Sequence, residues 1–441
     1  MRWIVETVPC DGVDPLALFD AVRESDGFFW SRASHAFATS GALHTIESRG
    51  AQRFADAANE VQDLLSSIGG RAGAVFEAQF PLLVGGFGCD AEPAGDPIWA
   101  GFPALRFVLP ARALVQRHGT STLAGVAEVG VHTSQAAARA ALRARLLRER
   151  ERLLQRDGRE PGGSAARDYR VEADRSPAQY RALVEAARDA VTAGVFEKLV
   201  VARSVRFASR EPIDVLALLG GLRRSYPSCT TFAVKRGDRS FVGASPERLV
   251  RVRGRQVDAA AVAGSAPRGR SPEEDERFGT ALRECKKDQE EHAAVVRGLR
   301  EALAPLCVGL DVPEAPRLLR IEGIQHLETP IAGTLRDDAN LFDLAGRVHP
   351  TPAVAGAPRD AALAWLARRE ALVRGWYGGG VGFVDAAGGG ELWAGLRSAL
   401  VCGTDARLYA GAGIVAASDP EAELVETRLK LRALLAPLLE L

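Results

Sequence analysis

The pattern of hydrophobic and polar positions changes twice along the chain. Residues 1–130 alternate short apolar runs with Gly, Pro and Asp, which is typical of strands separated by turns. Over 134–155 Ala, Leu and Arg dominate and β-branched residues are few, which predicts a helix. The next segment, 156–170, carries Pro, Gly and Ser and is the best linker candidate. The pattern thus predicts a sheet-rich amino-terminal region, 1–165, and a second region, 170–441.

The second region opens with a helix and a strand. Ser176 suits the N-cap of the helix, Pro177 its first position, and Gly194 its end. The run VFEKLVVARSVRF that follows has a period of two, so Lys198 shares a face of the strand with two hydrophobic residues. Turn residues that separate successive antiparallel strands come next, together with further helices. The last helix covers 419–439. The second region is therefore predicted to be α+β with much antiparallel sheet.

Composition and charge exclude several classes of protein. Hydrophobic residues make up 47% and charged residues 25%, which is typical of soluble globular chains and unlike disordered ones. The 56 basic and 56 acidic residues cancel, so no overall field draws in nucleic acid. No apolar run approaches the roughly 20 residues that span a bilayer. Six scattered cysteines without a CxxC pair indicate reduced packing residues. We expect a cytoplasmic protein with no nucleic-acid or membrane partner.

Two side chains are candidates for acid–base chemistry. Lys198 lies in an apolar strand, where desolvation disfavours an ammonium group and favours an amine that acts as a general base. The alternative is a lysine that snorkels or pairs with a carboxylate. Glu247 follows a Ser-Pro break in FVGASPERLV, which presents its carboxyl group at a turn. If shielded from water it could be a general acid; otherwise it is a surface charge.

Acidic residues on two helices are candidates for holding a metal ion. In the last helix Glu423 and Glu426 are three residues apart and Lys430 is four further on, so all three project from one face. Carboxylate oxygens suit Mg²⁺, and the acidic stretch at 287–292, KDQEEH, could supply a facing ligand. A solvated face of ion pairs is the alternative interpretation.

Glycines and histidines give weaker signals. No glycine cluster has the context of a nucleotide-binding loop, so a dinucleotide cofactor is not expected. In the strand GAGIV, 411–415, the glycines have no side chain that would keep a ligand away from the backbone. His326 and His349 flank apolar stretches, where structural histidines and ligand contacts both occur.

Taken in order, these segments resemble the chorismate-utilising enzymes. The resemblance covers about 175–441 and rests on FEKLVVARS, FVGASPERLV, AVAGSAPRGR, KDQEEH, IQHLETPIAG, HPTPAVAGAPRD, REALVRGWYGGGVGF, LRSALV and GAGIVAASDPEAELVETRLK. It implies a large α+β fold with antiparallel sheets in the middle and helices outside. In that fold the amino-terminal region packs into the same unit, which would make the linker a surface loop.

The resemblance also implies roles for the candidate residues. Lys198 matches the lysine that activates water for attack at ring carbon 2, and Glu247 matches the acid that protonates the departing 4-hydroxyl. Glu291 and Glu426 match the carboxylates that hold Mg²⁺ at the ring carboxylate of chorismate. Two further carboxylates would support the ion through water: Glu423 and Asp288. Expected substrate contacts are Gly264, Ser265, His326, Tyr377, Arg397, the backbone of Gly411, and Lys430.

Three positions bear on which member of the family this is. Lys198 favours water as the nucleophile, because the ammonia-using members lack this lysine. Ala263 replaces the lysine that forms a covalent intermediate in many aminodeoxychorismate synthases. Ala353 matches the alanine of isochorismate synthases, where salicylate synthases carry threonine. We therefore expect a Mg²⁺-dependent isomerase, an isochorismate synthase, with salicylate synthase as the alternative. The length of the chain slightly favours the menaquinone type of isochorismate synthase over the siderophore type. The oligomeric state, monomer or homodimer, is not decided by the sequence.

Overall fold

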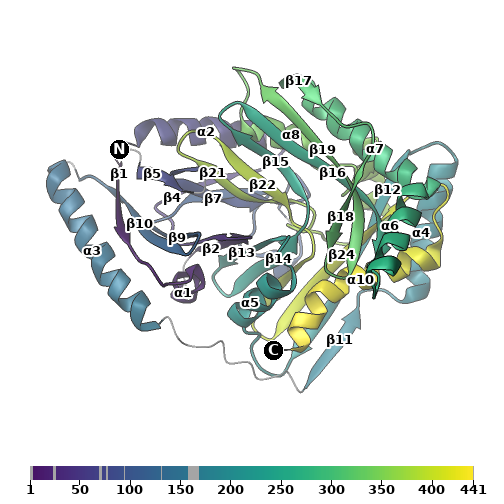
Figure 1. Ribbon diagram of the computed structural model, residues 1–441, viewed down its shortest axis with the longest axis horizontal. Helices are drawn as coiled ribbons and strands as arrows, with labels where there is room; N and C mark the ends of the chain where they lie inside the picture. The colour runs from purple at the N-terminus through teal and green to yellow at the C-terminus, as the bar shows by residue number, and fades with distance from the viewer. Residues whose placement is uncertain are drawn as a thin grey trace.

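Two antiparallel sheets lie in the middle of the molecule and helices cover their outer faces (Figure 1). The computed structural model describes residues 3–22, 26–68, 72–75, 78–93, 95–130, 132–156 and 168–440. The sequence predicted an α+β fold of this kind, with antiparallel sheets inside and helices outside, and the prediction is confirmed.

The larger sheet has twelve strands among the described residues. Its neighbours run in the order β1 (Trp3–Pro9), β10 (Thr120–Glu128), β9 (Arg112–Arg117), β3 (His35–Ser40), β2 (Gly27–Arg32), β13 (Thr230–Arg236), β14 (Arg239–Ser245), β23 (Ser398–Cys402), β24 (Asp405–Ile414), β12 (Lys198–Ser209) and β11 (Tyr169–Ala173). The short β20 (Gly356–Ala357) also pairs with β12. The amino-terminal strands therefore form one half of this sheet and strands from later in the chain form the other, and the two halves meet where β2 pairs with β13.

The second sheet has ten strands within the described part of the chain. They run in the order β17 (Cys307–Asp311), β19 (Ile324–Leu335), β16 (Gln256–Pro267), β15 (Arg248–Arg253), β22 (Gly390–Ala394), β21 (Gly380–Asp385), β7 (Leu82–Phe87), β8 (Leu105–Leu109) and β4 (His44–Ser48), and β18 (Arg317–Ile321) pairs with β19. A separate hairpin consists of β5 (Ala72–Val75) and β6 (Ala78–Phe80).

The helices fall into groups by the face that they cover. Against the outer face of the twelve-stranded sheet lie α1 (Pro15–Asp20), α3 (Gln135–Arg156), α5 (Val215–Ser225) and α10 (Pro420–Leu439). Against the ten-stranded sheet lie α2 (Arg53–Ser67), α6 (Pro272–Glu284), α7 (Lys286–Leu303) and α8 (Leu341–Val348). Beside β12 and β20 lie α4 (Pro177–Thr192) and α9 (Arg359–Arg369). None of the described helices is long and apolar enough to cross a membrane.

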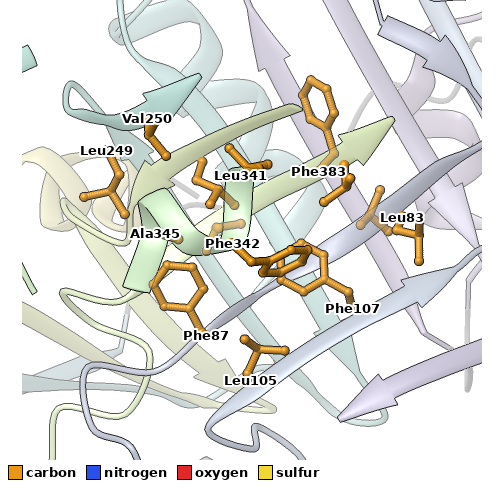
Figure 2. Close-up of a cluster of buried hydrophobic side chains, with 14 of the residues drawn as sticks. Leu83, Phe87, Leu105, Phe107, Leu249, Val250, Leu341, Phe342, Ala345 and Phe383 are labelled. Carbon is orange, nitrogen blue, oxygen red and sulfur yellow. The ribbon is translucent and has the colours of Figure 1, made fainter. Parts of the chain in front are cut away.

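The main hydrophobic core fills the space between the sheets. Period-two alternation divides β1 between two cores: Trp3 and Val5 face the other sheet, whereas Ile4 faces the outer helices. Figure 2 shows how α8 caps this core, with Phe342 directed at Phe107 of β8. Their rings meet edge to face with centroids 5.2 Å apart.

Local sequence signals located several elements correctly. The Ala- and Arg-rich segment forms α3, and Ser176 caps α4 through a capping box with Gln179. Asp419 caps α10. No disulfide bond joins the six cysteines, all of which lie among the described residues. Most of the predicted linker, 157–167, lies outside the described residues.

Candidate active site

A cavity lies where β12 and β24 of one sheet approach β16 and β19 of the other, between α7 and α10 (Figure 1). Eleven of the residues singled out in the sequence line it: Lys198, Glu247, Gly264, Ser265, Glu291, His326, Ala353, Tyr377, Arg397, Gly411 and Lys430. Three other carboxylates predicted at the metal site, Glu423, Glu426 and Asp288, are not among its lining residues. Segments 200 residues apart in the chain thus meet at one site.

Lys198 begins β12 and is 1% exposed. Its Nζ lies 2.9 Å from Oε1 of Glu291 on α7. The predicted alternation holds within β12, because Val200 also lines the cavity, whereas Leu199 packs in the core on the other face. Phe196, the other hydrophobic residue predicted on the face of Lys198, precedes β12 and packs in the same core as Leu199. Gly413 of the neighbouring β24 makes room for the pair: a Cβ atom there would lie 2.1 Å from Oε1 of Glu291 and 2.6 Å from Cε of Lys198.

Glu247 lies between the end of β14 and the start of β15, at the predicted break. Its carbonyl accepts a hydrogen bond from the backbone N–H of Ala394, and its side chain is buried. Burial raises the pKa of this carboxyl group to about 7, although Lys198 and Lys430 act in the opposite direction. A carboxyl group with this pKa is suited to donate a proton near neutral pH.

His326 on β19 is neutral and its tautomer follows from its partners. Burial, with the nearby charge of Arg397, lowers its pKa to about 3. Since a guanidinium can only donate, Nη2 of Arg397 donates to Nε2 of His326 at 3.0 Å. Nδ1 therefore carries the proton and donates to the carbonyl of Gly264 at 3.0 Å. Arg397 has a φ of 46°, a left-handed conformation that costs energy for a non-glycine residue.

Three carboxylates at or beside the cavity pair with lysines, and the pair of Glu291 and Lys198 is the first of them. Nζ of Lys430 lies 2.6 Å from Oε1 of Glu426, and it also donates to the carbonyl of Gly411 at 2.9 Å. Nζ of Lys287 donates to Oε1 of Glu423 at 2.5 Å. Burial and the neighbouring Glu426 raise the pKa of Glu423. Burial acts in the same direction on Glu426, but Lys430 outweighs it and lowers the pKa of that carboxyl group.

These carboxylates have the chemistry of a magnesium site. Oε2 of Glu423 is buried without a hydrogen-bond partner, which leaves a hard oxygen ready to accept from a cation or its water. Glu291 and Glu426 supply further oxygens of the same type. Within the described ranges, no three acidic, imidazole or thiol side chains already form a metal-binding group. Glu291, Glu423 and Glu426 each pair with a lysine instead.

Aromatic and small side chains form the rest of the wall. The rings of Tyr377 and Tyr409 are stacked with centroids 5.1 Å apart, and Trp99 donates to the hydroxyl of Tyr409. Ala353 also lines the cavity. His349 lies outside the cavity lining, and its Nε2 lies within hydrogen-bond distance of the backbone carbonyls of Gly88 and Cys89.

A buried ion pair behind the cavity holds its walls together. Arg374 pairs with Glu370 at 2.7 Å and donates to the carbonyls of Val200 and Val354, each at 2.8 Å. Glu370 also accepts from the backbone N–H of Ala202 at 2.7 Å. The pair therefore ties β12, which carries Lys198, to the segment that carries Ala353.

Sequence reasoning missed several residues of the site. Gly413 could have been found, because it is two positions beyond Gly411 in a strand and so shares its face. Tyr409 could have been found in the same way. Lys287 gave no signal in the sequence, because its partner Glu423 is 136 positions away.

Comparison with known proteins gives consistent results. The salicylate biosynthesis isochorismate synthase of Pseudomonas aeruginosa is 36% identical over 427 residues, 96% of this chain and 87% of that protein. The isochorismate synthase DhbC of Bacillus subtilis is 39% identical over 290 residues, 64% of this chain and 73% of that protein. The solved menaquinone-specific isochorismate synthase MenF of Escherichia coli superposes with a TM-score of 0.79 at 26% identity, covering 99% of this chain and 94% of that one.

A family model decides the wider assignment. The model described as chorismate binding enzyme matches residues 2–439, which includes the amino-terminal region that the motifs did not cover. The chain belongs to the chorismate-binding enzyme family, as the ordered motifs predicted.

Proposed function

We propose that this protein is an isochorismate synthase, which converts chorismate reversibly to isochorismate. One observation carries the proposal: a buried lysine, Lys198, and a buried carboxyl group with a raised pKa, Glu247, line the same cavity. A base and an acid held together in this way suit a reaction that adds one hydroxyl group and removes another. Relatives named as isochorismate synthases support the same activity.

The proposed reaction uses Lys198 and Glu247 in one displacement. In the structure Lys198 pairs with Glu291. With this pair opened and the lysine in its neutral form, its amine takes a proton from a water molecule, whose oxygen forms a bond to C2 of the ring. Both ring double bonds shift, C1=C2 to C1=C6 and C5=C6 to C4=C5, and the C4–O bond breaks, while Glu247 gives its proton to the departing hydroxyl, which leaves as water. One water is consumed and one is released, so the net reaction is an isomerisation.

Charged groups of the cavity would bind the two substrate carboxylates. Arg397 and Lys430 both line the cavity and present donors to an anionic ligand. Glu291 and Glu426 would hold a Mg²⁺ ion, with Glu423 nearby. When bound, the ion would neutralise the carboxylate on the substrate ring and hold it in place.

Product analysis tests the proposal. We would incubate the purified protein with chorismate, with and without Mg²⁺, and separate the products at early and late times. We expect Mg²⁺-dependent isochorismate in equilibrium with chorismate and no pyruvate beyond a blank. Salicylate and pyruvate as enzymatic products would instead support a salicylate synthase.

Variants assign the activity to the cavity. Lys198→Ala is expected to abolish turnover without unfolding the protein, because the base is lost. Lys235→Ala, which changes a lysine on β13 that does not line this cavity, should retain activity. Full activity of Lys198→Ala would overturn the assigned mechanism.

A further inference from the structure

The carboxylates beside the cavity are neutralised by lysines. Among the described residues, Glu291 pairs with Lys198, Glu426 with Lys430 and Glu423 with Lys287. Two of the three lysines, Lys198 and Lys430, line the cavity and have roles in the proposed reaction. The proposed reaction gives Lys287 no role.

Lys287 differs from the other two lysines in its position. It lies in the first turn of α7, does not line the cavity, and 22% of its side chain is exposed. Glu423, its partner, is 1% exposed. Lys287 can therefore leave the pair and reach solvent, whereas Glu423 cannot.

The pair of Lys287 and Glu423 offsets the repulsion between neighbouring buried carboxylates. Glu423 is affected by the negative charges of both Glu426 and Glu291, and its Oε2 has no hydrogen-bond partner. A buried carboxylate among like charges is costly unless a cation lies beside it. Lys287 and a divalent ion are alternative cations for this carboxylate, because Lys287 holds Oε1 and its positive charge opposes a second cation at the free Oε2.

We infer that Lys287 is a built-in counter-ion that competes with the divalent metal for Glu423 and thereby sets the metal affinity. It neutralises the carboxylates while the ion is absent and releases Glu423 when the ion binds. The inference rests on the metal site of the proposed function. Lys287 is thus a residue that tunes metal binding and does not touch the reacting atoms.

Metal titration without substrate tests this inference. Mg²⁺ alone is titrated into the full-length protein by calorimetry, and the melting temperature is followed over the same concentrations. In Lys287→Met the competing cation is gone, so we expect a Kd for Mg²⁺ lower by about fivefold or more. We also expect a lower melting temperature in EDTA and a larger rise on adding Mg²⁺.

Two further variants make the test specific. Lys286→Met removes the neighbouring lysine, which is 89% exposed and reaches Glu290 at 3.9 Å, and should leave the Kd unchanged. Lys287→Arg keeps the positive charge, so its Kd for Mg²⁺ should stay within about twofold of the wild-type value. This variant tests the inference even if Lys287→Met folds poorly.

The possible outcomes separate this inference from the proposed function. If the wild type binds Mg²⁺ and Lys287→Met binds it equally or more weakly, the competition is disproved and the metal site stands. If Lys287→Arg binds markedly more tightly than the wild type, charge competition is also disproved. If the wild type binds no Mg²⁺ at all, both the metal site and the inference fail.

Discussion

Glu247 is the residue whose burial has the clearest consequence for pH dependence. Its pKa in the folded protein is about 7, above the value of 4.5 for an exposed glutamate. Between these two values the folded state binds more protons than the unfolded state. The folded state therefore loses stability as pH rises through this window, by roughly 1.4 kcal/mol per pKa unit.

Glu247→Gln separates the stability effect from catalysis. The variant keeps the shape of the neutral acid but has no proton to donate, so isochorismate formation should fall by about 10²- to 10⁴-fold. The free energy of unfolding of the wild type should fall by about 2 to 3 kcal/mol between pH 5 and pH 8 relative to that of the variant, which has no carboxyl group to ionise at this position. Urea unfolding at both pH values measures this difference. Glu185→Gln, at an exposed position on α4, is the control and should show no such change.

Gly413 is a second residue whose effect can be predicted from one contact. Adding a methyl group would push on Glu291 and Lys198, because the added Cβ lies 2.1 Å and 2.6 Å from their atoms. We expect Gly413→Ala to lower kcat by about tenfold or more, since it displaces the base. Gly95→Ala is the control and should leave kcat unchanged, because a Cβ atom there meets nothing within 4 Å. A variant Gly413→Ala with normal kcat would show that the pair has room to move.

At the level of elements, the buried pair of Arg374 and Glu370 connects the end of α9 to β12. Removing one partner leaves a buried charge and frees two backbone carbonyls, which typically costs about 3 to 5 kcal/mol. We therefore expect Arg374→Ala to lower the free energy of unfolding by that amount, as measured by chemical denaturation. Arg369→Ala, an exposed arginine of α9, should change it by less than about 0.5 kcal/mol. Equal stability of the two variants would contradict the structural role of the pair.

Elements with local signals could be predicted from the sequence. The cap of α4 depends on residues three positions apart, Ser176 and Gln179, so the chain itself specifies it. The orientation of Lys198 followed from alternation along β12. Both kinds of signal act over one element and need no knowledge of the tertiary structure.

At the scale of the whole molecule, strand pairing joins the two predicted regions. β2 pairs with β13 and β7 pairs with β21, and these partners are about 200 and 300 positions apart. No local pattern specifies such pairings, so the order of strands in the sheets could not be predicted from periodicity. The cavity depends on this order, because β12 and β24 come from one sheet and β16 and β19 from the other.

The sequence therefore predicted the chemistry of the site better than its geometry. Ordered motifs gave the residue types around the cavity, and eleven of the predicted residues line it. The pair of Lys430 and Glu426 follows from their spacing in α10, whereas the other two pairs, Lys198 with Glu291 and Lys287 with Glu423, join different elements and depend on tertiary packing. The contact between Lys287 and Glu423 is one that only the folded chain reveals.

The source of the new hydroxyl group tests the central claim most directly. The protein is incubated with chorismate and Mg²⁺ in water enriched in ¹⁸O, and the isochorismate formed early is analysed by mass spectrometry. Attack of water at C2 predicts that each new isochorismate molecule carries one ¹⁸O. Isochorismate without the label would mean that the hydroxyl group migrates within the substrate, and it would contradict the roles assigned to Lys198 and Glu247.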